Sequence, residues 1–306
     1  MMTDGELRLA QAAGCAVVAP GEPGFPGPLR EIPDPPQVLY IKGSWLAEDE
    51  TAVAIVGSRH ASLYGQEVAQ QLAYELAVRG VTVVSGLARG IDAAAHRGAL
   101  DAGGRTLAVL GHGLSMVYPP EHDALAGRIV ESGALLSEYP MRAEPAPWNF
   151  PRRNRLISGL SLGVVVVEAA HRSGALITAD AALAQGRDVF AVPGKIHALN
   201  SEGTHALLKQ GARLVTSVQD ILEELRLVPV APINRIGLPD GAGAAAASDD
   251  ERALLAQLDA REPSDLDALA IKTRLPVAAC ASALLRLELK RLVKQLPGKR
   301  FVVRGS

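Results

Sequence analysis

The stretch that decides the fold is TAVAIVGSRHASLYGQEVAQQLAYELAVRGVTVVSG, residues 51–86. It begins with the β-branched run Ala52–Val56 and ends with a second run, Val81–Ser85. Between the two runs, apolar residues recur every four positions, at Val68, Leu72 and Leu76. Runs with apolar residues at both odd and even positions are typical of strands buried on both faces. The four-residue spacing is typical of one face of a helix, here ending at Gly80. The stretch therefore predicts a strand–helix–strand unit.

The same alternation continues along the chain to about residue 225. The further strand-like runs are Thr106–Leu110, Ala134–Ser137, Val164–Val167, Val189–Val192 and Arg213–Thr216. Strands that alternate with helices build a sheet whose strands are mainly parallel and whose two faces are both covered. We therefore expect an α/β fold with an extended, Rossmann-like, doubly wound sheet over residues 46–226.

The segments on either side differ in composition. Residues 1–45 hold a short helical pattern, about Glu6–Ala13, and then seven prolines between Pro20 and Pro36, so we expect an extended proline-rich segment. Residues 227–247 are rich in Pro, Gly and Ala and are predicted to be a linker. Residues 248–306 carry three helical patterns and a closing hairpin with a glycine turn, which predicts a small C-terminal winged helix-turn-helix domain.

The overall composition excludes a globally basic, histone-like protein. The 306 residues include 31 Lys and Arg against 33 Asp and Glu, a net charge of −2, so any anion site must come from local arrangement. Cys15 and Cys280 are far apart, which fits a reducing compartment, and the histidines show no metal-ligand spacing. The start has no signal-peptide pattern, and the apolar stretch 162–167 is far too short to span a membrane. We expect a cytoplasmic protein without a metal or a cofactor.

Five turns rich in glycine and polar residues follow the predicted strands. They are Gly57-Ser58-Arg59, Ser85-Gly86 with Arg89-Gly90-Ile91-Asp92, Ser173-Gly174 with Thr178, Gly194-Lys195, and Ser201 to Gly203. Such turns lie at the carboxyl edge of a parallel sheet, where helix N-termini present unpaired N–H groups to anions. One such turn is weak evidence, because a tight strand–helix turn needs glycine anyway. Five turns along one edge form a strip, and a strip suits a polymer of phosphates.

Residues 148–155, WNFPRRNR, combine aromatic side chains with three arginines. These are the ingredients of single-strand recognition, a stacking surface beside a phosphate clamp. The alternative is a solvated basic turn with Trp148 and Phe150 packed inward. The C-terminal segment also allows two interpretations. Residues 286–304 carry seven basic side chains and one acidic side chain, Glu288, but also several leucines. That surface suits contact with duplex DNA or docking of a partner.

Several runs together resemble the DNA processing protein A family (DprA, also called Smf). They are Val53–Arg59 (VAIVGSR), Ser85–His96 (SGLARGIDAAAH), Phe150–Ser161 (FPRRNRLISGLS), Glu168–Thr178 (EAAHRSGALIT) and Val192–Lys195 (VPGK). The resemblance covers roughly residues 32–225, and the tail is similar to the optional C-terminal domain of the family. Before Pro20 the chain has too few residues for the helical N-terminal domain that many relatives carry.

The resemblance implies a protein that binds single-stranded DNA in natural transformation and is not an enzyme. It further implies that the protein protects incoming strands, brings a RecA-type recombinase onto them and forms a homodimer. Carried over position by position, the DNA-binding residues are Gly57, Ser58, Arg59, Ser85, Gly86, Phe150, Arg153, Asn154, Arg155, Gly174, Thr178 and Lys195.

Two alternatives use the same architecture. A phosphoribohydrolase of the lysine-decarboxylase-like group would also hold phosphates on glycine turns, but it carries a P-G-G-x-G-T-x-x-E run where this chain has Pro193-Gly194-Lys195-Ile196. A winged-helix transcription regulator with a ligand-sensing Rossmann domain would need sequence-specific binding of duplex DNA.

Overall fold

The computed structural model describes residues 3–227 and 249–303, apart from 256, 259–263, 274, 290–292 and 297–299. The chain divides into two compact units, Met1–Ile233 and Asn234–Ser306. The predicted linker, residues 227–247, lies outside the described residues except for its first position, so its limits stay a prediction.

The first unit is built on a nine-stranded sheet with the strand order β1-β2-β6-β5-β4-β3-β7-β8-β9. The strands are β1 (Cys15–Val18), β2 (Leu39–Gly43), β3 (Ala52–Val56), β4 (Thr82–Ser85), β5 (Thr106–Val109), β6 (Ala134–Ser137), β7 (Gly163–Val166), β8 (Asp188–Ala191) and β9 (Arg213–Leu214). From β6 to β9 all neighbouring strands are parallel, whereas β1 and β2 form an antiparallel edge.

The helices of this unit are α1 (Asp4–Ala12), α2 (Gly27–Arg30), α3 (Leu63–Val78), α4 (Ile91–Asp101), α5 (Asp123–Ser132), α6 (Asn149–Gly159), α7 (Gly174–Ala184), α8 (Glu202–Lys209) and α9 (Val218–Glu224). Three short 3₁₀ turns are η1 (Ala47–Glu50), η2 (Pro120–His122) and η3 (Leu199–Ser201). Helix α3 ends as predicted, with Gly80 at a φ of 77° directly after its last turn.

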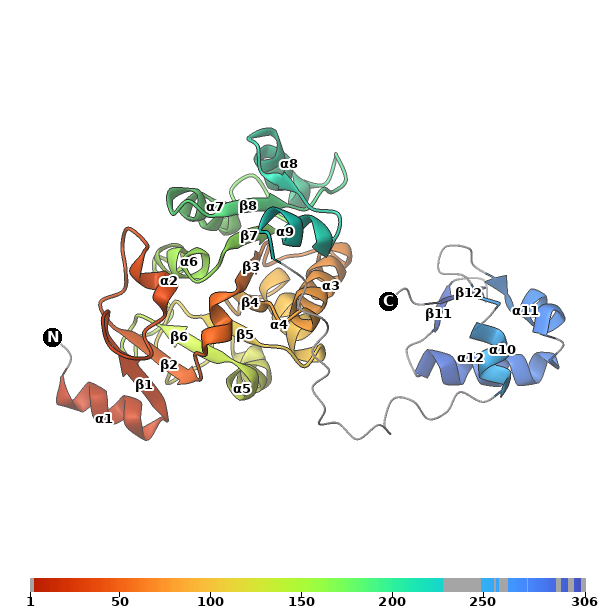
Figure 1. Cartoon of the computed structure of the whole chain (residues 1–306), viewed down its shortest axis with the longest axis horizontal. Helices are drawn as coiled ribbons and strands as arrows, with labels where there is room; N and C mark the ends of the chain where they lie inside the picture. Colours follow the sequence, from red (N-terminus) through yellow and green to blue (C-terminus); the bar gives the residue numbers. More distant parts are fainter. Residues whose placement is uncertain are drawn as a thin grey trace. The chain divides into compact units, whose positions relative to one another are not determined.

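Helices cover both faces of the sheet (Figure 1). Ala52, Ala54 and Val56 of β3 pack into one core with α2, α6 and α7, whereas Val53 and Ile55 pack into another core with α3, α4 and α9. Alternate residues of one strand thus face two different helical layers, which is why the strand is apolar at every position. The predicted mainly parallel, doubly wound α/β sheet is confirmed.

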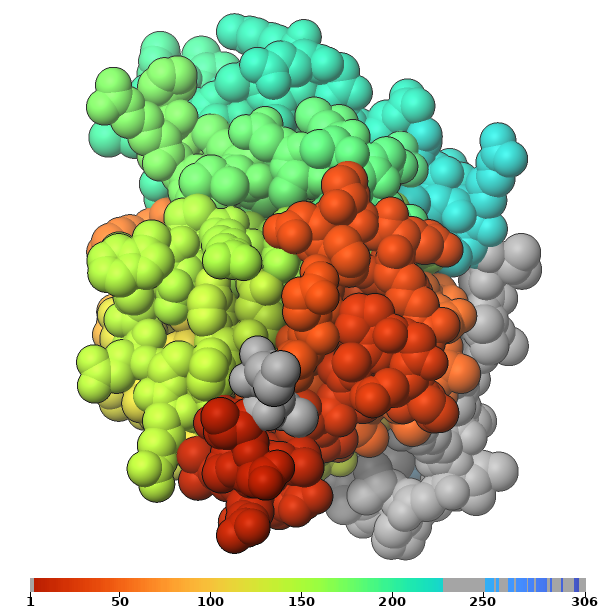
Figure 2. All heavy atoms as spheres, turned by 90° about the vertical axis from the view of Figure 1, so that its left-hand side faces the viewer, coloured from red at the N-terminus to blue at the C-terminus, as the bar shows by residue number. Residues whose placement is uncertain are grey.

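The first 45 residues differ from the expected extended segment. They form α1, β1, α2 and β2, and the two strands extend the main sheet beyond β6. Phe25, Leu29 and Ile32 lie between and beside the prolines and are buried in the core shared with α6. Apolar burial overrides the proline-rich composition, and a proline in the first turn of α2 is compatible with a helix. In Figure 2 this segment, in red and orange, forms one surface with the yellow-green residues that include α6.

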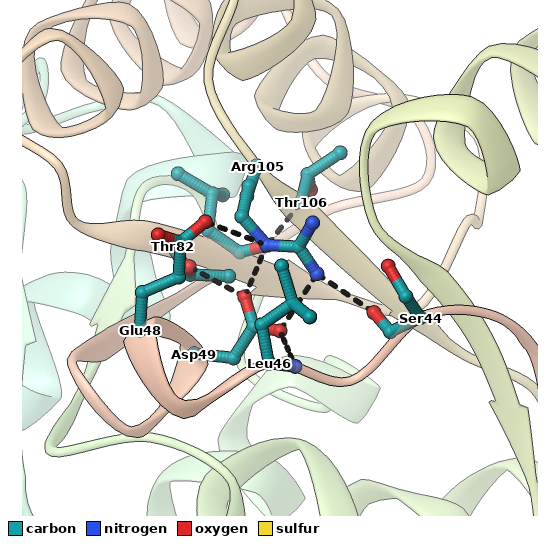
Figure 3. A network of polar contacts seen from close by, with 8 residues as sticks. Ser44, Leu46, Glu48, Asp49, Thr82, Arg105 and Thr106 are labelled. Carbon is teal, nitrogen blue, oxygen red and sulfur yellow. Dashed lines mark hydrogen bonds and ion pairs between the residues drawn. The ribbon is translucent and has the colours of Figure 1, made fainter.

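A buried polar network ties η1 to the amino ends of β4 and β5 (Figure 3). The Asp49 carboxylate is fully buried and accepts hydrogen bonds from Arg105 Nε at 2.8 Å and Nη2 at 2.7 Å, and from the Thr82 hydroxyl at 2.8 Å. Arg105 Nη2 also donates to the backbone oxygen of Ser44 at 2.7 Å. The network lies at the edge of the sheet opposite the carboxyl ends of the parallel strands.

The second unit contains α10 (Asp249–Leu255), α11 (Leu266–Thr273) and α12 (Val277–Leu289), with the strand order β10-β12-β11. These strands are β10 (Ser264–Asp265), β11 (Val293–Leu296) and β12 (Arg300–Val303). The unit has a hydrophobic core of its own, centred on Leu269, Leu284 and Leu287. The predicted winged helix domain is confirmed, although the residues of its glycine turn lie outside the described part.

Within the described ranges, no helix is both long enough and apolar enough to cross a membrane. Cys15 and Cys280 are both buried and free. Among these same residues, no group of three or more His, Cys, Asp or Glu side chains is arranged to hold a metal ion.

Candidate functional site

A cavity of about 610 Å³ opens at the carboxyl end of β3. Its walls come from the turn after β3, the turn between β4 and α4, the first turns of α6 and α7, and the loop before α6. Most of the predicted DNA-binding residues line it, namely Gly57, Ser58, Arg59, Phe150, Arg153, Asn154, Gly174 and Thr178. The sheet therefore brings together segments that are more than a hundred residues apart in the sequence.

The turn after β3 is shaped by close backbone approaches. A Cβ atom at Gly57 would lie 2.6 Å from Ile91 Cγ1 and 2.9 Å from the backbone oxygen of Glu168, so only glycine fits there. The amide of Ser58 donates to that same oxygen at 2.7 Å. The turn is thereby fixed against β7 and α4, and it presents Arg59 as an exposed side chain at the cavity.

The Phe150 ring lies among cationic and aromatic side chains. Arg59 Cζ is 5.1 Å from the ring centroid and Arg153 Cζ is 5.9 Å from it, both within the range of cation–π attraction. The ring of Tyr118 lies 6.0 Å away at an interplanar angle of 37°. Phe150 itself is half-buried, so the cavity contains an aromatic surface in a positively charged setting.

Arg153 is buried, with only 3% of its surface exposed. Its Nη1 donates to the backbone oxygens of Gly86, at 3.0 Å, and Val109. Burial lowers the pKa of Arg153 to about 10, although the nearby Asp92 opposes that shift. A Cβ atom at Gly86 would lie 2.5 Å from Arg153 Nη1, so glycine makes room for the guanidinium. Arg153 thus holds the ends of β4 and β5 together at the base of the cavity.

The buried carboxyl group of Asp92 fixes the neighbouring turn. It accepts hydrogen bonds from the amides of Gly86 at 3.1 Å and Ala88 at 3.4 Å. Burial raises the pKa of Asp92, which the charge of Arg153 opposes. The acidic group that lines the cavity is therefore turned toward backbone donors and a buried cation.

The first turn of α7 forms the opposite wall. Ser173 is the N-cap residue, and its hydroxyl accepts a hydrogen bond from the amide of Ala175 at 3.3 Å. The backbone oxygen of Gly174 accepts one from Asn154 Nδ2 at 3.1 Å, which ties α6 to α7. The N-terminal end of α7 carries partial positive charge, and Arg172 adds an exposed full charge beside it. This wall is suited to an anion.

Four predicted residues do not line the cavity. Ser85 is buried, and its hydroxyl donates to the backbone oxygen of Ile55 at 2.6 Å, while Gly86 lies beneath Arg153. Arg155 is paired with Asp34 at 2.8 Å and Glu138 at 2.7 Å, and it lines a second cavity of about 440 Å³. Lys195 is an exposed residue of the loop after β8. The structure thus separates both cations from the cavity.

Several lining residues were missed by the sequence reasoning. His60, Tyr118 and Arg172 also line the cavity. Arg172 stands inside the run EAAHRSG, directly before the helix cap, so its position was a usable signal. Tyr118 lies in an irregular loop after β5, and no spacing rule connects that loop to α6.

The chain is similar to known proteins in both of its units. The family model described as DNA recombination-mediator protein A matches residues 16–226, and the DprA winged helix domain model matches residues 239–299. Protein Smf of Escherichia coli is 45% identical over 279 residues, which cover 90% of this chain and 74% of that protein. The DNA processing protein DprA of Streptococcus pneumoniae is 47% identical over 204 residues, covering 65% of this chain and 71% of that protein.

Two solved structures are similar to the chain. The X-ray structure of DNA processing protein A from Streptococcus pneumoniae matches with a TM-score of 0.68 and 42% identity, over 73% of this chain and 78% of that one. DNA processing protein A from Helicobacter pylori, described for its unique single-stranded DNA binding mode, matches with a TM-score of 0.62 and 30% identity. That match covers 69% of this chain and 95% of the other. The chain belongs to the DNA recombination-mediator protein A family, also named DprA or Smf.

Proposed function

We propose that this protein binds single-stranded DNA whatever the base sequence of the strand, and that it acts in natural transformation. The observation that carries the proposal is the half-buried Phe150 ring, which lies 5.1 Å from the cation of Arg59 in a cavity walled by the first turns of α6 and α7. The reported single-stranded DNA binding of the Helicobacter pylori relative supports the same assignment.

The cavity offers each kind of contact that a single strand needs. Arg59, Arg172 and the amides at the start of α7 suit phosphate oxygens, while Phe150 suits the face of a base. Stacking on a ring does not depend on base identity, because every base has a π-face. Asp92, the only carboxyl group among the described residues of the wall, already accepts two backbone hydrogen bonds, so it opposes a phosphate less than an exposed carboxylate would.

The twelve predicted residues receive different roles under this proposal. Those that line the cavity contact the strand. Among them, Arg153 and Asn154 chiefly stabilise the walls of the cavity through their hydrogen bonds. Ser85 and Gly86 support the walls from below, and Arg155 anchors α6 through its two carboxylate partners. Lys195 contacts the strand beyond the cavity, because its exposed position leaves the ammonium group accessible.

The finer parts of the proposal rest on family membership. The protein would protect incoming strands, bring a RecA-type recombinase onto them, form a homodimer and act in the cytoplasm without catalysing a reaction. Residues 46–226 would bind the strand, and a linker over 227–247 would join them to a winged helix over 248–306. That winged helix would contact duplex DNA or a protein partner.

Binding assays with purified full-length protein test the proposal against its alternatives. Gel shifts on single strand, duplex and a panel of mononucleotides, each at two salt concentrations, should give the tightest binding to single strands of any sequence. Turnover of a nucleoside monophosphate would instead favour a phosphoribohydrolase. Selective binding of one duplex sequence would favour a transcription regulator.

A further inference from the structure

Trp148 is an exposed aromatic residue beside the cavity but not in its wall. The residue is 75% exposed, although its neighbours Pro147 and Phe150 both line the cavity. The alternative in which Trp148 packs inward is therefore wrong. Trp148 is the N-cap residue of α6, but its side chain makes no capping hydrogen bond. The exposed indole therefore contributes neither to the packing of the core nor to the capping of the helix.

Helix geometry sends Trp148 and Phe150 in opposite directions. Trp148 has helical backbone angles, φ −76° and ψ −17°, so the two residues lie roughly 200° apart around the axis of α6. Their Cα atoms are only about 5 Å apart at that spacing. Phe150 enters the cavity and Trp148 faces solvent on the other side of the same helix end. A strand that crosses this end would meet one aromatic surface on each side.

Arg152 supplies a cation on the same side as Trp148. Residues four apart on a helix are neighbours on its surface. Arg152 is exposed, and no ion pair within 4.0 Å joins it to any described residue. Arg152 lines the second cavity together with Asp34 and Glu138, and each of these two carboxylates forms an ion pair with Arg155. Arg152 is thus available to a phosphate where Arg155 is not.

We propose that Trp148 and Arg152 form a second nucleotide subsite on the outer side of α6. The indole stacks on a base next to the one held by Phe150, and the guanidinium meets a phosphate between or beside them. The strand backbone then crosses the N-terminal end of α6, where the helix dipole favours its negative charge. This inference rests on the proposed binding of single strands, and it adds a contact that the cavity does not contain.

Tryptophan fluorescence tests the stacking directly, because the chain has only two tryptophans. Trp45 is half-buried against the core. In a full-length Trp45→Phe variant the remaining emission comes from Trp148, and we expect it to be quenched when a twelve-residue oligothymidylate binds. In the otherwise unchanged chain, Trp148→Ala should weaken binding of that oligonucleotide about tenfold, and Trp148→Phe should restore most of the loss. Tyr74→Ala, an exposed aromatic residue outside both cavities, should change nothing.

The role of Arg152 has its own measurement. Arg152→Ala should flatten the plot of log K against log salt by about 0.7, as expected for one lost phosphate contact on a single strand. Arg97→Ala, an exposed arginine of α4 outside both cavities, is the matched control and should leave the slope unchanged.

The outcomes separate this inference from the proposed function. If the unchanged protein binds the oligonucleotide but Trp148→Ala binds equally well and Trp148 emission stays constant, the subsite is refuted and the function stands. If Arg152→Ala keeps the full slope, the phosphate contact is refuted. Failure of the unchanged protein to bind single strands would overturn both the function and the subsite.

Discussion

At the scale of single residues, the arginines of the cavity differ in what their charge does. Arg153 is buried and bonded to two backbone oxygens beside Asp92, whereas Arg59 is exposed and lies over Phe150. Loss of a buried donor leaves its acceptors without a hydrogen bond, while loss of an exposed charge costs the fold little. The first arginine therefore maintains the site and the second is available to a ligand.

This difference predicts unequal effects of two substitutions on the free energy of unfolding. Arg153→Ala should lower the free energy of unfolding by about 3–5 kcal/mol, because two buried carbonyl groups lose their hydrogen-bond donor and the buried Asp92 loses a neighbouring positive charge. Arg59→Ala should change it by less than about 0.5 kcal/mol. Urea unfolding curves measure both values. Equal stability of the Arg153→Ala variant and the unchanged protein would contradict the structural role of Arg153.

His96 gives the fold a pH dependence. Its Nδ1 lies 2.7 Å from the Thr106 hydroxyl, which donates its own proton to the backbone oxygen of Val83 at 2.7 Å. Nδ1 must therefore carry the proton, and the buried Nε2 has no hydrogen-bond partner. Burial, aided by the charge of His122, lowers the pKa of His96 to about 3. The folded protein holds this ring neutral at every ordinary pH.

Stability should consequently fall as the pH drops below about 6.5, the usual pKa of histidine in an unfolded chain. Between that value and 3 the unfolded chain binds one more proton at His96 than the folded protein does, which costs about 1.4 kcal/mol per pH unit. His96→Gln should reduce the slope of unfolding free energy against pH by that amount. Urea unfolding at pH 5, 6 and 7 measures the slope, and an identical slope in the variant would rule out His96 as its source.

At the scale of elements, the network around Asp49 joins η1 to two strands far from the cavity. Asp49→Asn should lower the free energy of unfolding by about 3 kcal/mol, because Arg105 would lose its buried carboxylate partner. Affinity for single strands should stay the same. Asp101→Asn is the matched control, since its pair with Arg128 at 3.1 Å is exposed and contributes at most about 1 kcal/mol. Equal losses of stability in the two variants, or a weaker affinity after Asp49→Asn, would contradict this assignment.

Periodicity predicted most elements because burial on both faces makes the central strands largely apolar. The predicted ends were less accurate where an unusual residue pairs in the sheet. Strand β7 begins at Gly163 and β8 at Asp188, one residue before each apolar run, and these two residues pair with each other. The first 45 residues could not be predicted from their prolines, because their structure depends on burial against α6.

The sequence predicted those parts of the candidate site that lie in turns at the carboxyl ends of strands. The turns at Gly57 and Gly174 follow β3 and β7, so sheet topology alone brings them together. The direction of a long side chain depends on its partners. Arg155 turns to Asp34, which comes from a loop 121 residues away, and no local pattern reveals that contact.

At the scale of the whole molecule, the two units have separate hydrophobic cores. A chain that ends at residue 227 should therefore fold cooperatively and still bind single strands, because every residue of the cavity lies before that point. Binding of duplex DNA, if the full chain has any, should fall more than binding of single strands. Urea unfolding and fluorescence anisotropy of labelled oligonucleotides check both statements. A truncated protein that unfolds without cooperativity, or that no longer binds single strands, would contradict the division of roles.

The most direct test of the account is the salt dependence of single-strand affinity in two cavity variants. If Arg59 neutralises one phosphate, Arg59→Ala should weaken binding to every sequence alike and reduce the slope of log K against log salt by about 0.7. If Phe150 stacks on a base, Phe150→Ala should weaken binding by about 1–3 kcal/mol and leave the slope unchanged. Circular dichroism establishes that both variants are folded. Folded variants that bind single strands with the affinity and slope of the unchanged protein would show that this cavity is not the DNA-binding site.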